Sequence, residues 1–364
     1  MVCFDDKQQT TNNKQQEYLI NNLLDSLVLV DIAFCFDENQ FIQAMVAISS
    51  LLYNANKTTR YKLYLICPDG AYRTEIVEYL NSLTYDFEYK IVDVALNLFS
   101  EGYWWENNYW SKAIFYRLQL PTLLPDIKKI IYADSDTIFL GDISALMSIN
   151  IEEKLLLGVK DTANLKEEIS KRKIPIDGNY ICSGFVVMNL ELMRELDLMT
   201  KWEHLCVNKY HFPDQDIINL TCKDKIGFLP PKYNSYLVKS HPFIQKMIDE
   251  QIWSKEEVNQ MLYNPIVYHF VGWDKPWKIR RENRIMDILW WKYAKMTPYF
   301  EILNQDYITT YMRYETNRFI VLFNRKIKLF DKIPIIFLKY RDNKLVWYLF
   351  KIFPLWSIKK MDIR

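Results

Sequence analysis

Glycine is scarce in this chain, with 8 among 364 residues, and none of them forms a Gly-x-Gly-x-x-Gly or Walker-type loop. A nucleotide would therefore not be held by a glycine-rich phosphate cradle. The six cysteines include no Cys-x-x-Cys pair, which excludes a zinc ribbon or a thioredoxin-type motif and suits a reducing compartment. No charged-then-apolar leader opens the sequence, and no apolar run approaches the roughly 18 to 20 residues of a membrane span. We expect a protein that is neither secreted nor membrane-spanning.

Half of the residues are hydrophobic and 15% are aromatic. That fraction supplies a core for one large domain, with or without an appendage. It excludes a chain that is disordered throughout, a collagen-like chain and a disulfide scaffold. The net charge of +1 conceals an asymmetry, because residues 278–364 carry 19 Lys and Arg against 8 Asp and Glu.

Three regions follow from these patterns. Residues 1–26 form a polar tail that contributes little to a core. Residues 278–364 interleave basic groups with bulky apolar and aromatic side chains, which favours association with an anionic membrane surface over nucleic acid. We expect this region to be helical; the alternative to membrane association is a helical appendage folded onto the main domain. The expected location is cytoplasmic, peripheral on the inner face of a bacterial cytoplasmic membrane.

The region between the two tails alternates strand and helix patterns. Apolar runs predict strands near residues 27–36, 61–67, 89–94 and 129–133. Helical spacing predicts helices near residues 41–53, 74–83 and 111–120. Strand and helix in alternation predict an α/β domain with a mostly parallel central sheet.

The strand near residue 130 ends in Asp134-Ser135-Asp136. In an open parallel sheet, ligands bind beyond the carboxyl ends of the strands, where these carboxylates would lie. Two hard anionic oxygens can hold Mg²⁺ or Mn²⁺, and such ions keep positions open for diphosphate oxygens. The pattern alone also fits a capped turn. A third interpretation is a haloacid-dehalogenase-type phosphatase with Asp134 as nucleophile and Asp136 as general acid.

A second polar loop follows the apolar run at residues 266–268. It contains His269, Gly272 and Lys275. An imidazole beside two carboxylates completes a site suited to Mn²⁺, although a lone histidine is more often a hydrogen-bonded core residue. Glycine at 272 would let the backbone approach a phosphate, and Lys275 would offset the phosphate charge.

In order and spacing, these motifs resemble the retaining glycosyltransferases of family eight, which include glycogenin and bacterial lipopolysaccharide core galactosyl- and glucosyltransferases. The resemblance covers about residues 28–278 and rests on several segments: Ala33-Phe-Cys35-Phe-Asp37-Glu-Asn39, Ser111-Lys-Ala-Ile-Phe-Tyr-Arg117, Asp134-Ser-Asp136, Tyr180-Ile-Cys182-Ser183-Gly184, Asp214-Gln215-Asp216, Lys232-Tyr233-Asn234 and His269-x-x-Gly272-x-x-Lys275. It implies a single GT-A-type, Rossmann-like domain over residues 27–277.

The resemblance also implies roles for individual residues. The metal ligands would be Asp134, Asp136 and His269. The catalytic group would comprise Gln215, Asp214, Arg117 and Asp161. The nucleotide and donor would contact Ala33, Cys35, Asp37, Asn39, Ser135, Cys182, Ser183, Gly272 and Lys275. Cys182 departs from the family pattern, which usually has asparagine there, and a thiol is a weaker hydrogen-bond donor.

The implied reaction is retaining transfer of glucose or galactose from a UDP-sugar to a glycan. The acceptor would be lipopolysaccharide core or another lipid-linked oligosaccharide, and the attack would be metal-assisted and front-face. A non-catalytic sugar-binding module is an alternative, beside the phosphatase. The sequence leaves open which hexose is transferred, which acceptor receives it and by which linkage.

Overall fold

The computed structural model describes residues 27–70, 72–94, 111–169, 171, 174–175, 177–208, 210–273, 275–278 and 285–310, and five strands between residues 328 and 359. Residues 1–26, for which the sequence predicts a polar tail, lie outside this part. The chain divides into two compact units. The first comprises Met1–Pro276 and Asn283–Pro298, and the second comprises Trp277–Glu282 and Tyr299–Arg364.

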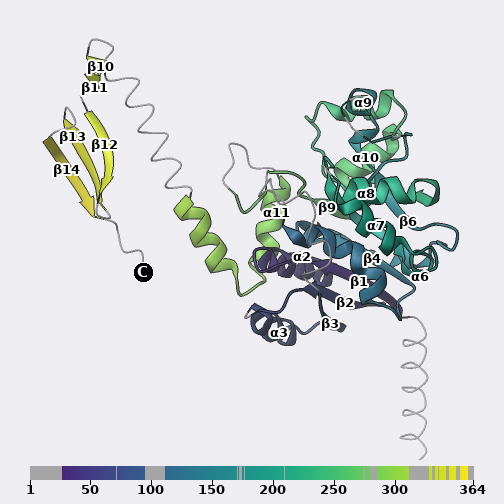
Figure 1. Ribbon diagram of the computed structural model, residues 1–364. Coiled ribbons are helices and arrows are strands. Elements are labelled where there is room, and N and C mark those ends of the chain that lie inside the picture. The colour runs from purple at the N-terminus through teal and green to yellow at the C-terminus, as the bar shows by residue number, and fades with distance from the viewer. Residues whose placement is uncertain are drawn as a thin grey trace, which may run out of the picture. The chain divides into compact units, whose positions relative to one another are not determined.

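A seven-stranded sheet forms the centre of the first unit (Figure 1). Its order is β3-β2-β1-β4-β7-β6-β8. The strands are β1 (Val28–Cys35), β2 (Thr59–Cys67), β3 (Phe87–Asp93), β4 (Lys129–Asp134), β6 (Leu156–Lys160), β7 (Ile181–Asn189) and β8 (Ile226–Phe228). All pairs are parallel except the two that β7 makes, with β4 and with β6. The mostly parallel α/β sheet expected from the sequence is confirmed.

The strand order reverses direction between β1 and β4. Cys35 at the end of β1 lies in register with Asp134 at the end of β4. The carboxyl ends of these two strands therefore meet at a topological switch point, where open α/β sheets bind ligands. The fold thus places the predicted carboxylate pair beside the loop that follows β1.

Helices connect and cover the strands. They are α2 (Phe41–Tyr53), α3 (Tyr72–Ser82), the 3-10 helix η2 (Lys112–Gln119), α4 (Leu120–Leu123), α5 (Lys166–Ile169), α6 (Leu190–Glu195), α7 (Leu198–Cys206), α8 (Pro213–Cys222), α9 (Phe243–Asp249), α10 (Lys255–Tyr263) and α11 (Ile285–Ala294). Short 3-10 helices occupy Ser144–Ser148 (η3), Thr162–Asn164 (η4), Lys223–Lys225 (η5) and Pro231–Tyr233 (η6). The predicted helix at 111–120 is wrong in type, because most of that segment is the tighter η2.

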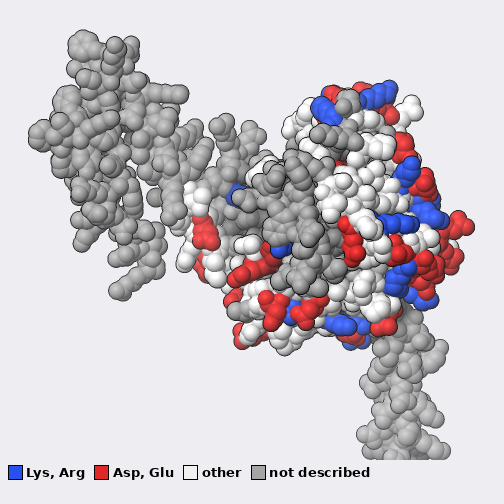
Figure 2. Space-filling model, in the orientation of Figure 1, with Lys and Arg blue, Asp and Glu red and all other residues white. Residues whose placement is uncertain are grey.

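The core lies where helices cover the sheet. Every residue of β7 is buried, and its apolar run is continuous because both faces are covered. α8 packs on β7, α6 packs on β4, and Trp202 of α7 is completely buried. On the outer surface, basic and acidic side chains are interspersed over the described part of the face that Figure 2 shows.

A second, two-stranded sheet stands apart from the large one. It pairs β5 (Thr137–Phe139) with β9 (Val267–His269) in antiparallel register, with Thr137 opposite His269. α2 packs on β5, and Ser50 Oγ accepts a hydrogen bond of 2.9 Å from the Phe139 backbone N–H. This small sheet joins two parts of the chain that lie more than 120 positions apart.

α11 lies beyond residue 277, where the sequence predicts the end of the main domain, and it packs on α2 of the first unit. Asn54 Nδ2 donates to Tyr293 Oη at 2.9 Å, and the rings of Tyr53 and Tyr293 meet edge to face. Part of the region assigned to the tail is therefore held by the sheet domain.

The prediction of a helical tail is wrong for the described residues after 327. In the second unit, β12 (Ile336–Arg341), β13 (Lys344–Leu349) and β14 (Phe353–Lys359) form an antiparallel sheet, and β10 (Lys328–Leu329) pairs with β11 (Ile333–Pro334). Aromatic and β-branched residues are frequent in these strands and favour a pleated backbone. The Asp342-Asn343 dipeptide between two such runs is a turn signal. Among the described residues, no helix is long and apolar enough to cross a bilayer.

Asp142 provides a test of the fold. Its carboxylate accepts hydrogen bonds from Asn56 N at 2.9 Å, Tyr61 Oη at 3.0 Å and Ser144 N at 2.9 Å. Burial raises its pKa, but the bonds from Ser144 and Asn56 outweigh burial, so the net pKa is lowered. The stabilisation is therefore present above the unfolded-state pKa and is lost as pH falls through the lower folded-state value.

We expect Asp142→Asn to lower the free energy of unfolding at pH 7 by about 1 to 3 kcal/mol, because charge-assisted bonds are weakened. In urea titrations, the difference in free energy of unfolding between wild type and variant should narrow only below about pH 3.9, which is the ordinary pKa of aspartate. Asp224→Asn is the control, since that side chain is exposed in η5. Equal stability of the two variants at pH 7 would contradict this role of Asp142.

Candidate active site

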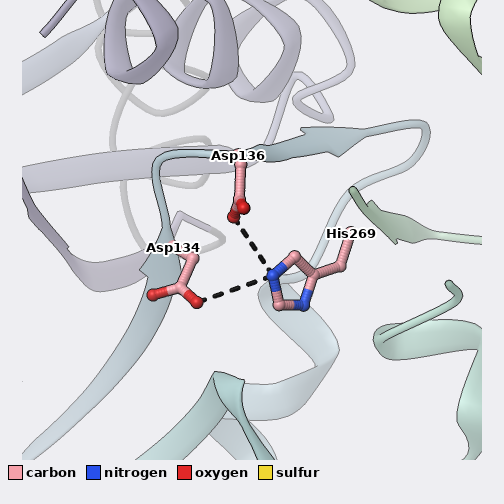
Figure 3. Close-up of side chains that lie close together, drawn as sticks. All are labelled: Asp134, Asp136 and His269. Carbon is pink, nitrogen blue, oxygen red and sulfur yellow. Dashed lines mark ion pairs between the residues drawn. The ribbon is translucent and has the colours of Figure 1, made fainter. Parts of the chain in front are cut away.

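The two aspartates lie at the turn between β4 and β5. Asp134 ends β4, and Asp136 immediately precedes β5. The turn is held by Thr137 Oγ1, which donates to the Asp134 carbonyl at 2.8 Å, and by Ser135 Oγ, which donates to Gln40 Oε1 at 3.1 Å. Both carboxylates point toward the same ring nitrogen of His269 (Figure 3).

His269 reaches this turn through the pairing of β9 with β5. Its Nε2 lies 3.1 Å from Asp136 Oδ1 and 3.5 Å from Asp134 Oδ2. One ligand atom from each of the three residues lies within 4.8 Å of the other two. The sequence prediction that these side chains meet around one point is confirmed in its geometry.

Two features fit a divalent cation at this point. Asp136 Oδ1 is buried and lies 3.1 Å from His269 Nε2, so these two ligand atoms face one another. Gly184 of β7 allows His269 and Asp134 to pack closely against the strand, because an added Cβ would lie 2.1 Å from His269 Cε1 and 2.7 Å from Asp134 Oδ2. Two carboxylate oxygens and one imidazole nitrogen suit Mn²⁺ or Mg²⁺.

Without a cation, the positive charges of His269, Lys275 and Arg117 compensate the negative charges of Asp134 and Asp136. Burial lowers the pKa of His269, but the Asp136 carboxylate beside it outweighs burial and raises the value to about 10. Burial also raises the pKa of Asp136, yet Lys275 and His269 hold it well below its ordinary range. The pKa of Asp134 is raised by burial in spite of the nearby Arg117 guanidinium. A bound cation would take the place of the imidazolium charge.

Arg117 links the aspartate turn to α8. Its Nη2 donates to Asp134 Oδ1 at 2.6 Å, and its Nη1 lies 3.2 Å from Asp214 Oδ2. The guanidinium also stacks over the Tyr132 ring, 4.5 Å from its centroid. η2 carries this arginine, and Ser111 caps η2 and donates to the Asp37 carboxylate after β1. One short helix therefore connects the loop after β1 with the aspartate turn.

Lys275 lies on the other side of Asp136. Its ammonium donates to Asp136 Oδ2 and to the Phe270 carbonyl. Gly272, within the same loop, has a φ of +74°, which side-chain-bearing residues rarely adopt. The loop after β9 therefore places the Lys275 ammonium against Asp136, whereas the role predicted from the sequence, offsetting the charge of a phosphate, stays a prediction.

The amide of Gln215 is held from both ends. Its Oε1 accepts from the Ser183 N–H at 2.9 Å, and its Nε2 donates to Tyr180 Oη at 3.2 Å. Tyr180 in turn donates to Asp216, whose second oxygen accepts the backbone N–H groups of residues 211 and 212. Asp216 thus fixes the start of α8, and Gln215 and Asp214 face Ser183.

The remaining residues that the sequence assigns to the site differ in how exposed they are to solvent. Cys35 is buried beside Asp134, and Ala33 is completely buried inside β1, with no surface for a ligand. Asn39 is exposed, and its backbone N–H donates to Asp37 at 2.9 Å. Asp161 caps η4 by accepting the Ala163 N–H at 2.8 Å.

Cys182 of β7 lies beside the imidazole of His269. Its Sγ lies 4.0 Å from His269 Nδ1, and it contributes with Asp161 to raising the pKa of Tyr236, for which burial is the larger cause.

Sequence reasoning assigned no role to Tyr132, Tyr180 or Asn234. Tyr132 donates to Asp134, which lies two positions ahead on the same face of β4. This period of two was readable in the sequence. The contact between Asn234 Oδ1 and His269 Nδ1, 3.1 Å apart, crosses 35 positions and had no local signal.

The fold is that of solved glycosyltransferases. A galactosyltransferase, LgtC, in complex with donor and acceptor sugar analogs, aligns with a TM-score of 0.61 at 20% identity, covering 74% of this chain and 96% of that one. Among curated proteins, General stress protein A of Bacillus subtilis (strain 168) is 26% identical over 268 residues, which are 71% of this chain and 91% of that protein.

The family follows from the sequence profile of Glycosyl transferase family 8, which matches residues 31–280. The chain belongs to this family. It is also similar to the Lipopolysaccharide 1,2-glucosyltransferase of Escherichia coli (strain K12), with 26% identity over 261 residues covering 68% of this chain and 72% of that protein. The family assignment favours a glycosyltransferase over the phosphatase alternative.

Gly184→Ala tests the cation site directly. The new methyl group would collide with His269 and Asp134 and displace these two side chains, so we expect Mn²⁺ to produce no rise in Tm. Gly141→Ala is the matched control, because its Cβ would meet only Ile266, at an ordinary 3.7 Å. If Mn²⁺ raised the Tm of the Gly184→Ala protein as much as that of wild type, the cation would lie elsewhere.

Proposed function

We propose that this chain is a retaining, metal-dependent hexosyltransferase that takes glucose or galactose from a UDP-sugar and transfers it to a glycan. The observation that carries the proposal is the convergence of Asp134, Asp136 and His269, whose ligand atoms lie within 4.8 Å of one another, packed against Gly184. A diphosphate leaving group needs concentrated positive charge when its bond to the sugar breaks. A divalent cation held by these three residues would supply it.

The donor would lie along the carboxyl ends of β1 and β4. Asp37 and Asn39, in the loop after β1, are the groups that would contact the nucleoside. Lys275, with the backbone of Gly272, would face the diphosphate from the loop after β9. A lysine and a peptide N–H stabilise charge that accumulates on the leaving phosphate.

The carboxylates of Asp134 and Asp136 and Nε2 of His269 would hold Mn²⁺ or Mg²⁺, which when bound supplies Lewis-acid stabilisation of the diphosphate leaving group. Asp134 is kept in place by Arg117 and Tyr132. His269 is kept in place by the β5–β9 pairing and by Asn234.

How the configuration of the sugar is retained depends on which side chain faces its anomeric carbon on the side opposite the leaving phosphate. Gln215 is the side chain that the family resemblance brings nearest to the far face, and a neutral amide is a weak nucleophile. Both ends of this amide are already hydrogen-bonded. We therefore favour front-face attack, in which the leaving phosphate accepts the proton of the acceptor hydroxyl. Gln215, Asp214, Arg117 and Asp161 would orient the sugar and the acceptor.

The acceptor would be a lipid-linked glycan. Two observations support this: the similarity to lipopolysaccharide glucosyltransferases, and the basic, aromatic composition of residues 278–364. The attraction of a basic segment to anionic lipid depends on its charge and does not require a helix. Attachment to a membrane surface is part of the proposal.

Thermal shift with UDP and Mn²⁺ tests the proposal. We expect UDP to raise the Tm of the wild type only when Mn²⁺ is present, because a cation held by Asp134, Asp136 and His269 would supply the positive charge that favours diphosphate binding. Asp136→Asn should lose this coupling and lower donor hydrolysis by more than about tenfold, or about 1.4 kcal/mol of barrier. Asp224→Asn, exposed and away from the site, should retain both. A UDP response that is equal with and without Mn²⁺ would contradict the metal role, and no response to UDP at all would favour a non-catalytic sugar-binding module.

The stereochemistry is tested by NMR of the first product formed. With an α-linked UDP-hexose as donor and water or a glycan as acceptor, we expect the α-anomer, because attack and departure occur on the same face. A β-anomer at early times, before mutarotation, would show inversion and remove the front-face mechanism.

A further inference from the structure

Asn234 lies in a short extended segment that runs beside β9. The Ser235 N–H donates to the Val267 carbonyl at 2.9 Å, and the His269 N–H donates to the Ser235 carbonyl at 2.8 Å. Just before this segment, η6 ends at Tyr233, and the Asn234 N–H donates to the Pro231 carbonyl at 3.2 Å. The backbone on both sides of Asn234 is therefore fixed relative to His269.

The side chain of Asn234 is completely buried and meets the far side of the imidazole. Its Oδ1 lies 3.1 Å from His269 Nδ1, while Nε2 of the same ring faces Asp134 and Asp136. The carbonyl oxygen of an amide only accepts hydrogen bonds, so this contact places a proton on Nδ1. The neutral ring then carries its lone pair on Nε2, the atom that faces the carboxylates.

A hydrogen-bond donor in place of the Asn234 oxygen would favour the other tautomer of His269. If a donor faced Nδ1, the neutral ring would carry its proton on Nε2 and direct it at Asp134 and Asp136. That ring could not ligate a cation through Nε2. Among the described residues, the Cys182 thiol also lies near Nδ1, 4.0 Å away, and sulfur is a weak acceptor. The choice of tautomer therefore depends on the Asn234 oxygen.

We infer that Asn234 is a positioning residue that selects the His269 tautomer able to bind a divalent cation. The inference rests on the proposed function, since it requires a cation at Asp134, Asp136 and His269. It assigns Asn234 no contact with the substrate. The group that matters is its acceptor oxygen, because Nδ2 is buried without an acceptor among the described residues.

Two substitutions separate the oxygen from the rest of the side chain. Asn234→Leu keeps the approximate volume but removes the acceptor. Asn234→Asp keeps an acceptor and removes the NH₂ group. We expect the Kd of the nucleotide-free full-length chain for Mn²⁺, measured by isothermal titration or by EPR of the free ion, to rise about 10- to 100-fold in the leucine variant. The aspartate variant should bind at least as tightly as wild type.

Asn189→Ala is the control for a loss of stability alone. Asn189 caps α6 by accepting the Leu192 N–H at 3.0 Å and donates to the Ile151 carbonyl. This variant should lower the Tm without changing the Kd for Mn²⁺. The tautomer itself can be read from ¹⁵N NMR of the imidazole in Mg²⁺-saturated protein, which has only four histidines to assign. Wild type should show the proton on Nδ1.

The outcomes are distinguishable. If wild type binds Mn²⁺ and the leucine variant binds it equally well, the inference about Asn234 is overturned and the proposed function stands. The same holds if the aspartate variant loses as much affinity as the leucine variant, because the NH₂ group or the packing would then be responsible. If wild type itself binds no Mn²⁺, the metal-dependent function and the inference fall together.

Discussion

The site depends on the pairing of two three-residue strands. β5 begins one position after Asp136, and β9 ends at His269, so the register that sets Thr137 opposite His269 also sets the imidazole beside the carboxylates. Strands this short are not stable alone. They are held by α2, through Ser50 and Phe139, and by the backbone bonds of Ser235 along the other side of β9. A shift of one residue in this register would turn His269 to the opposite face.

Charge balance explains why so many ionisable groups can be buried together. Two carboxylates in a partly buried turn repel one another, and loss of solvent penalises each. Arg117 compensates Asp134 from one side, and Lys275 compensates Asp136 from the other. His269 lies between them. The arrangement leaves Nε2 of His269 facing one oxygen of each carboxylate, so that the three ligand atoms converge on a single point where a cation could take the place of the imidazolium charge.

The sequence predicted what depends on local pattern. Apolar runs located the strands, and Asp134 and Asp136 could be placed at the end of one of them because carboxyl ends are where ligands bind. Contacts between distant segments were less accessible. The antiparallel direction of β7 and the β5–β9 pairing have no local signature. Asn234 and Tyr180 act only through side chains far away in the sequence. The strands after residue 327 lie in a segment whose basic and aromatic composition is compatible with helix as well as strand, so composition alone does not distinguish the two.

The central claim is that Asp134, Asp136 and His269 bind one divalent cation. Anomalous diffraction from crystals grown with Mn²⁺ and UDP measures this directly. The account predicts a single strong peak about 2.0 to 2.3 Å from a carboxylate oxygen of each aspartate and from Nε2 of the histidine. A peak elsewhere, or ordered UDP with His269 still paired to both carboxylates and no peak between them, would contradict it.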